Sequence, residues 1–214
     1  MKPRRRDRDS GLGNRMMQRS HTNLRLLATV ALCAALLTSS ACGGSTNDPA
    51  TTATAAVFTP FADPPAAGSI TMQAGTAAGL AFQIRVTVTG VQHVFGAAFH
   101  VTFNSAVVRF DSADFSNSVL KGSGISTQFS ATPVLGHANE IAVVATRLQN
   151  GAGTVPGVDI TQGDLVVLNF HAINGTSGTA ISFGTPREAC DPTARTCGPV
   201  TPVPTWIGGT LSAN

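Results

Sequence analysis

The 214-residue sequence predicts an all-β fold, a nine-stranded β-sandwich with jelly-roll topology, from three observations. Apolar and polar residues alternate repeatedly along the chain, and a period of two places the apolar side chains on one face of a strand. The alternating runs are short and are separated by turns rich in Gly and Asn. No stretch beyond residue 68 shows a clear 3.6-residue period, which favours packed sheets over helices.

The clearest alternation lies in the segment 82–110. A first run covers 82–89 and ends near Gly90, a second covers 97–103, and a third begins at Val107. These runs are rich in β-branched and aromatic residues, so we expect antiparallel strands that share one core. The complete set of expected strands is 69–73, 82–89, 97–103, 107–113, 126–131, 140–147, 164–172, 180–183 and 205–211.

The N-terminal part has the pattern of an export signal. Residues 26–37, LLATVALCAALL, form an apolar run of twelve that follows Arg19 and Arg25. This run is shorter than the roughly 20 residues of a membrane-spanning helix and suits the apolar region of a signal peptide. We therefore divide the chain into a signal peptide (1–41), a flexible linker (42–67) and a domain (68–214).

The net charge of +3 belongs to this signal segment. Eight of the 14 Lys and Arg residues precede Cys42, and from Cys42 onward six basic and nine acidic residues leave a net charge of −3. A basic balance would suggest nucleic-acid binding. Because the basic residues lie in a segment that export removes, we expect no nucleic-acid partner.

The end of the signal segment resembles the lipobox of bacterial lipoproteins. Ala41 directly precedes Cys42, although Ser39 stands where Leu is commonest in that motif. The resemblance implies acylation of Cys42 and a lipid anchor in the bacterial cell envelope, at the outer membrane or cell surface. The alternative is a plain secretory signal that is cut near Ala41.

The expected linker is rich in Gly, Thr, Ala and Pro and has no sustained periodicity, which is typical of a disordered tether. Val57, Phe58 and Phe61 are the exceptions, and we consider packing of these three side chains against an edge of the domain.

The order of features in the domain resembles that of cohesin modules, within the wider superfamily of carbohydrate-binding sandwiches. The matching segments are FQIRVTVTGVQHVFGAAFHVTFNSAVVRF (82–110), EIAVVATRLQNGAGTVPGVDITQGDLVVLNFHAI (140–173) and WIGGTLSAN (206–214). The resemblance implies a jelly-roll sandwich that binds a protein partner, dockerin-like or another envelope or secreted protein, in polysaccharide-degrading assemblies. It also implies that the partner meets the sheet containing the third, fifth and sixth expected strands.

Alternation along those three strands suggests which side chains face outward. The candidates for the partner-binding face are His100, Thr102, Thr127, Phe129, Ala142, Val144 and Thr146. The run from Ile141 to Ala145 is apolar on both sides, which fits either a buried central strand or an apolar partner face.

A polysaccharide ligand is the alternative to a protein partner. Sugar rings stack on flat aromatic side chains, yet the chain has no Tyr and a single Trp, Trp206. Trp206 is therefore the candidate sugar contact, and the other interpretation of this residue is that it caps the core. A third possibility is a purely structural envelope lipoprotein.

We expect no catalytic, metal or cofactor site. The histidines are scattered, and no pattern brings two of the acids Asp111, Asp114, Glu140, Asp159 and Asp164 together for glycoside hydrolysis. Cys190 and Cys197 are separated by six residues in an exported chain, which favours a disulfide over a metal site because no His lies nearby.

Overall fold

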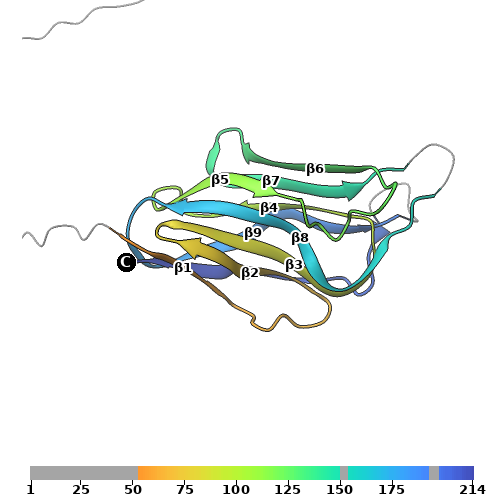
Figure 1. The fold of residues 1–214 in the computed structure, drawn as a ribbon, viewed down its shortest axis with the longest axis horizontal. Coiled ribbons are helices and arrows are strands. Elements are labelled where there is room, and N and C mark those ends of the chain that lie inside the picture. The colour runs from red at the N-terminus through yellow and green to blue at the C-terminus, as the bar shows by residue number, and fades with distance from the viewer. Residues whose placement is uncertain (1–52, 150–153, 193–197) are drawn as a thin grey trace, which may run out of the picture. The chain divides into compact units, whose positions relative to one another are not determined.

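The computed structural model describes residues 53–149, 154–192 and 198–214, and these form strands joined by turns (Figure 1). The strands are β1 (Ala56–Pro60), β2 (Ser69–Ala78), β3 (Ala81–Val94), β4 (Gly96–Thr102), β5 (Val108–Asp114), β6 (Thr127–Val134), β7 (His137–Arg147), β8 (Val158–Ala172), β9 (Thr176–Asp191), β10 (Gly198–Pro199), β11 (Thr205–Ile207) and β12 (Gly209–Ala213). No helix among the described residues is long and apolar enough to cross a membrane.

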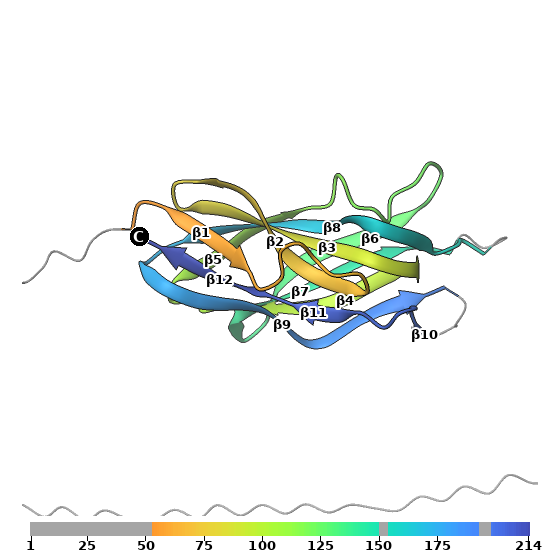
Figure 2. The same ribbon diagram turned by 90° about the horizontal axis from the view of Figure 1, so that it is seen from below.

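The strands form two sheets that lie face to face (Figures 1 and 2). The larger sheet has the order β1-β12-β9-β4-β7-β6, with β10 paired to β9, and the smaller has the order β11-β2-β3-β8-β5. All pairs are antiparallel except β11 with β2. The predicted β-sandwich is confirmed.

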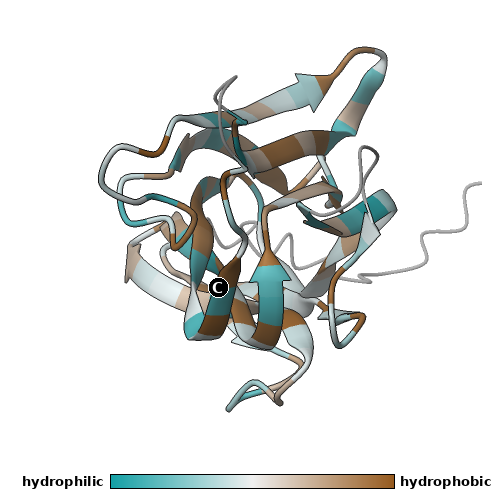
Figure 3. Ribbon diagram, turned by 90° about the vertical axis from the view of Figure 1, so that its right-hand side faces the viewer, coloured by the Kyte–Doolittle hydropathy of each residue, from teal (hydrophilic) through white to brown (hydrophobic). Residues whose placement is uncertain are grey.

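The core fills the space between the sheets because each strand turns its apolar positions inward. On β3 the buried residues include Phe82, Ile84 and Val86, whereas Arg85 is exposed. The same alternation is visible as brown and teal bands along the strands in Figure 3. Burial of these side chains is the main force that holds the layers together.

Two aromatic clusters occupy this core. In the first cluster, the ring centroid of Phe170 of β8 lies 5.6 Å from that of Phe82, 5.5 Å from that of Phe103 and 5.6 Å from that of Phe110. The second cluster joins Phe99, Phe183 and Trp206 and is described below. Aromatic pairs at such distances add to the stabilisation from burial alone.

The strand count and the domain start need correction. Eight of the nine expected segments each lie in a single strand to within a residue at either end, and the ninth, 205–211, is divided between two, but the described residues form twelve strands. β1 was expected to belong to the linker, yet Ala56 and Phe58 are buried and β1 pairs with β12 along its length. The sandwich therefore begins before residue 68, because Ala56 and Phe58, at alternate positions, suffice for the buried side of an edge strand once a partner strand is present.

The expected last strand, 205–211, is divided between the two sheets. β11 pairs with β2 and β12 pairs with β1 and β9, with Gly208 at the crossing. A Cβ atom at Gly208 would collide with the carbonyl oxygen of Ile181. The absence of a side chain at Gly208 lets the backbone pass close to β9 where the chain changes sheet. The apolar pattern of 205–211 gives no sign of that change.

Candidate functional site

The outer face of the larger sheet is the candidate site, and its orientation follows from the pairing of β4 with β7. The pairs Phe99–Val143 and Val101–Ile141 are buried, so they face the core. The intervening pairs are Ala98–Val144, His100–Ala142 and Thr102–Glu140, and they are only partly buried. Opposite residues share a face, so these pairs point away from the core.

The predicted outward positions on β4 and β7 therefore have the expected orientation. His100, Thr102, Ala142, Val144 and Thr146 all lie on the outer face. The apolar run on β7 is two-sided for a simple reason: Ile141, Val143 and Ala145 enter the core, while Ala142 and Val144 remain partly exposed. We name the outward residues of β4 and β7, together with Ser182 and Gly184 of β9, the outer face.

The two positions expected on β6 face the other way. Thr127 is opposite Arg147 and Phe129 is opposite Ala145, so both side chains are on the core side of the sheet. Phe129 is partly buried and stacks on Phe115 at a centroid distance of 4.9 Å. The outward residues of β6 are instead Gln128, Ser130 and Thr132. From Gln128 to Pro133 the run alternates polar and apolar residues, which agrees with this orientation, and only Thr127 and Val134 at its ends break the alternation.

A small polar cluster lies on the outer face. His100 Nδ1 lies 2.6 Å from Glu140 Oε1, and His137 Nδ1 lies 3.6 Å from Glu140 Oε2. The side chains of His100 and Glu140 are 22% and 16% exposed, so solvent reaches the pair only partly. The cluster places a carboxyl group and imidazole nitrogens beside the small outward side chains of β4 and β7.

Gly184 leaves this cluster open from the β9 side. A Cβ atom at Gly184 would lie 3.0 Å from Thr102 Cγ2, 3.2 Å from His100 Cβ and 3.5 Å from Glu140 Oε1. A larger residue would cover the His100–Glu140 pair. The sequence alone did not single out Gly184 or Glu140 for this face, because the pairing of β4 with β9 contains a register shift.

A shallow hollow of about 540 Å³ lies beside this cluster, at the end of the face. Thr102, Asn104, Asn139 and Ser182 contribute polar atoms to its lining. A surface hollow lined by small polar groups can accept a side chain of a docked protein.

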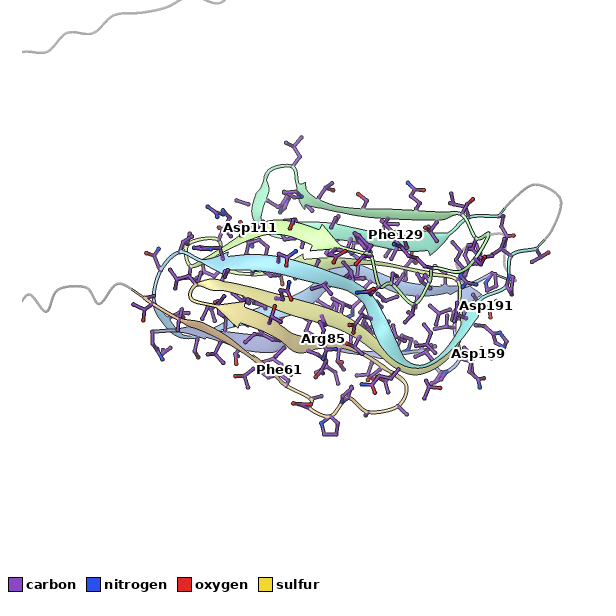
Figure 4. All side chains as sticks on the ribbon, viewed as in Figure 1. Phe61, Arg85, Asp111, Phe129, Asp159 and Asp191 are labelled. Atoms are coloured by element: carbon purple, nitrogen blue, oxygen red, sulfur yellow. The ribbon has the colours of Figure 1, made fainter. Side chains whose placement is uncertain are left out.

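The outer face of the smaller sheet is organised differently. The loop after β1 covers β2, and Gln73 donates a hydrogen bond of 2.7 Å to the carbonyl oxygen of Ala62. Arg85 lies 3.5 Å from Asp164, which also accepts a hydrogen bond of 2.6 Å from Thr87. Arg85 is visible on the front of this sheet in Figure 4. The charges of Arg85 and Asp164 and the loop over β2 make the outer face of the smaller sheet less suited to a flat protein contact.

The acids considered for hydrolysis do not converge. Asp111 lies 2.8 Å from Arg109, and Asp159 accepts a 2.9 Å bond from the backbone of His93. Asp111 and Asp159 lie toward opposite ends of the sandwich (Figure 4). Among the described residues, no group of three or more His, Cys, Asp or Glu side chains could hold a metal ion.

Asp114 has a local role at the end of β5. Its carboxylate accepts hydrogen bonds from the backbone N–H of Ser116 at 2.7 Å and from the Ser116 hydroxyl at 3.0 Å. These bonds, with the charge of Lys121, lower the pKa of Asp114. The carboxylate thus fixes a turn and is not poised as a proton donor.

Trp206 packs against the core. Its ring centroid lies 5.5 Å from Phe99 and 5.0 Å from Phe183, and the residue is partly buried. A ring that is engaged on one side by two phenyl groups has less surface left for a sugar. This position favours the interpretation of Trp206 as a core cap.

The cysteine predictions fall wholly or partly outside the described residues. Cys42 precedes residue 53, and Cys197 lies between the second and third described segments. Cys190 is on β9, opposite Gly96 of β4 and Pro199 of β10. Acylation of Cys42 and the Cys190–Cys197 disulfide therefore stay predictions.

No protein-family model and no curated protein matches this sequence. Among solved structures, the sixth cohesin of scaffoldin B from Acetivibrio cellulolyticus, in complex with a Cel5 dockerin, is 16% identical. That match covers 68% of this chain and 89% of that chain, with a TM-score of 0.46. A non-cellulosomal cohesin from the archaeon Archaeoglobus fulgidus is 14% identical; the match covers 61% of this chain and 83% of that chain, with a TM-score of 0.42. A cohesin from Clostridium acetobutylicum is 12% identical; the match covers 64% of this chain and 86% of that chain, with a TM-score of 0.43. All three of these structures are cohesin modules.

Proposed function

We propose that this protein is a non-catalytic binding module of the bacterial cell envelope, and that its outer face recognises another protein. The observation that carries the proposal is the character of that face. Ala98, Thr102, Ala142 and Val144 lie side by side on neighbouring strands, partly exposed, with no described segment across them. The exposed Glu188 of β9 borders this patch opposite Ala98. A partly apolar patch of small side chains loses little entropy when a partner covers it.

The partner is a protein of the dockerin-like class or another envelope or secreted protein, within polysaccharide-degrading assemblies as the sequence resemblance implies. The His100–Glu140 pair supports recognition of a specific partner, because a polar cluster beside a patch of small side chains must be matched when it is desolvated. A partner without complementary polar groups would leave this pair buried and unsatisfied.

Replacing Ala142 or Val144 with Arg tests the proposal. We expect either change to reduce partner binding more than tenfold, because an unpaired charge buried in an interface costs several kcal/mol. The wild type and variants are immobilised, exposed to the secreted and envelope proteins of the source cells, and compared by quantitative mass spectrometry. Arg is tolerated at these sites because both side chains already face solvent in part.

Thr210 of β12 offers a matched control, since it is also an outward, partly buried position of the same sheet. Thr210→Arg is expected to leave binding unchanged. Equal capture by the Ala142→Arg, Val144→Arg and Thr210→Arg proteins would contradict the proposal. Retention on insoluble polysaccharide that is lost in Trp206→Ala would support the carbohydrate alternative, and binding in neither assay would support a structural role.

We also propose that Cys42 anchors the module and that Cys190 and Cys197 form a disulfide, as the sequence predicts. Acyl chains contribute about 0.8 kcal/mol per buried CH₂ group, so two or three chains hold a protein stably on a membrane. Replacing Cys42 with Ala is expected to move nearly all of the protein from the membrane fraction to the soluble exported fraction. Immunoblots of the two fractions measure this, and a variant that stays in the membrane fraction would argue against the anchor.

A further inference from the structure

The edge strand β6 differs from the other edges of the sandwich. β5 carries Arg109, Asp111 and Asp114, and such charges discourage pairing with another strand. β11 spans only three residues, and on β1 the N–H of Ala56 already donates to Gly79. β6 has eight residues, TQFSATPV, and none is charged.

No described segment lies beyond β6 in the larger sheet. The strand order ends at β6, and β6 forms the upper rim of the described domain in Figure 1. Natural proteins usually protect such an edge with charges, a bulge or a covering loop, because its free N–H and C=O groups can pair with a further strand. β6 is protected only at its end, where Pro133 stands and the pairing register shifts between Pro133 and Val134. The six residues 127–132 before it form a neutral edge to which a further strand could pair.

The hydrogen bonds of β7 show which β6 groups are free. The N–H of Leu148 donates to Ser126 of the β6 side at 2.9 Å, whereas the N–H of Arg147 donates to Phe95 of the β4 side at 3.0 Å. Backbone groups alternate in direction along a strand. Even-numbered residues of β6 consequently bond to β7, and Thr127, Phe129 and Ala131 direct their N–H and C=O groups to the free edge.

Pro133 fits the same assignment. A proline in a sheet places its nitrogen, which has no hydrogen, toward the open side of an edge strand. Pro133 therefore offers a carbonyl oxygen at the free edge and no donor.

We propose that β6 pairs with β6 of a second copy of this chain, antiparallel and about a two-fold axis at Ser130. In this register Phe129 of each copy is opposite Ala131 of the other, and each residue gives its N–H to the facing carbonyl. The N–H of Thr127 donates to the carbonyl of Pro133 in the other copy, so the missing N–H of Pro133 leaves that hydrogen bond intact. The two larger sheets join into one continuous sheet.

The side chains are compatible with this register. On the core side, Phe129 and Ala131 are both partly buried at the margin of the core and would cover each other across the axis. On the outer side, Ser130 faces Ser130 and Gln128 faces Thr132, all of them neutral groups that can hydrogen-bond. A two-fold interface requires a surface that complements itself, and this edge meets that condition without opposing like charges.

The dimer is expected to be weak, because two paired edges bury less surface than a standard stable interface. Sedimentation velocity of a chain that starts at residue 43 measures it directly, since the sandwich encloses its own core. We expect the sedimenting mass to rise from monomer to dimer between roughly 1 and several hundred micromolar. A monomer throughout that range would overturn the proposal.

Charge substitutions at Ser130 test the register itself. Ser130→Lys and Ser130→Glu each place like charges opposite one another at the axis, so each protein alone is expected to stay monomeric over the same range. An equimolar mixture places Lys opposite Glu, and we expect it to dimerise at least as strongly as the wild type. Failure of the mixture to associate would overturn the register.

Two further variants separate this effect from damage to the fold. Thr210→Lys adds the same charge on the same sheet, away from β6, and is expected to leave the dimer intact. Ala131→Pro removes one N–H from the free edge and none from the β6–β7 pairing, so it should weaken dimerisation at least tenfold. Far-UV circular dichroism and thermal unfolding confirm that each variant is folded, and dimerisation unaffected by Ala131→Pro would contradict the proposal.

Discussion

Replacement of Phe170 by Ala is expected to destabilise the sandwich by about 3–5 kcal/mol, the range measured for large aromatic truncations in protein cores. Phe170 is 1% exposed, and its ring contacts Phe82, Phe103 and Phe110. Phe103 follows β4 of the larger sheet, whereas the other three rings belong to the smaller sheet. The cavity would therefore lie between the two layers, where neither sheet can relax without losing its contact with the other.

Urea unfolding followed by circular dichroism measures this change, with the free energy extrapolated linearly to water. Phe61→Ala is the matched control, because Phe61 is 61% exposed and the same truncation there should alter the free energy of unfolding by no more than about 0.5 kcal/mol. Similar losses for the two variants would mean that the core does not depend on the Phe170 cluster.

Period-two alternation was sufficient for most of the fold. It located the strands around Phe82 and Phe99 and gave the correct orientation of His100 and Ala142, because each of these strands has one buried face. A strand with a single buried face has its side-chain orientation fixed by its own sequence. The candidate face on β4 could therefore be placed from the sequence, whereas the run from Ile141 to Ala145 of β7, apolar on both sides, left open whether Ala142 and Val144 are exposed.

The expected outward residues of β6 were wrong, although Gln128, Ser130 and Thr132 alternate with apolar residues there. Thr127 breaks the alternation at the start of the strand, and Phe129 and Ala131 are only partly buried. The register with β7 gives the orientation unambiguously, because Phe129 is opposite the buried Ala145. Pairing also decides the structure of β1, which becomes a strand only because β12, more than 140 residues later, returns to pair with it.

Side-chain contacts between loops are the other feature that the sequence did not predict. Arg147 ends an expected strand and would be taken for a surface residue, yet it is 8% exposed. Its Nε donates to the carbonyl of Leu120 at 2.8 Å and its Nη1 to the carbonyl of Pro156 at 2.9 Å. One guanidinium thus joins two loops that are distant in sequence.

Replacement of Arg147 by Met is expected to lower the free energy of unfolding by about 1–3 kcal/mol. Met keeps much of the apolar stem but donates no hydrogen bond, so the buried carbonyl of Leu120 loses its partner, whereas water can reach the carbonyl of the exposed Pro156. Leaving a buried acceptor unsatisfied costs about 1–3 kcal/mol, and bonds to a charged donor lie at the upper end. Burial lowers the pKa of Arg147, but an arginine stays protonated at any ordinary pH, so the loss should not depend on pH between about 5 and 9.

Arg187→Met is the matched control. Arg187 is exposed and makes one longer bond, 3.3 Å, from Nη1 to the carbonyl of Phe183, so its loss should change stability by no more than about 0.5 kcal/mol. Native-state hydrogen exchange adds a local measurement, because Arg147→Met should free the loop around Leu120 and increase exchange there before the sheets open. If exchange in that loop stayed unchanged while global stability fell, the guanidinium would stabilise the sandwich by packing and not by holding the two loops.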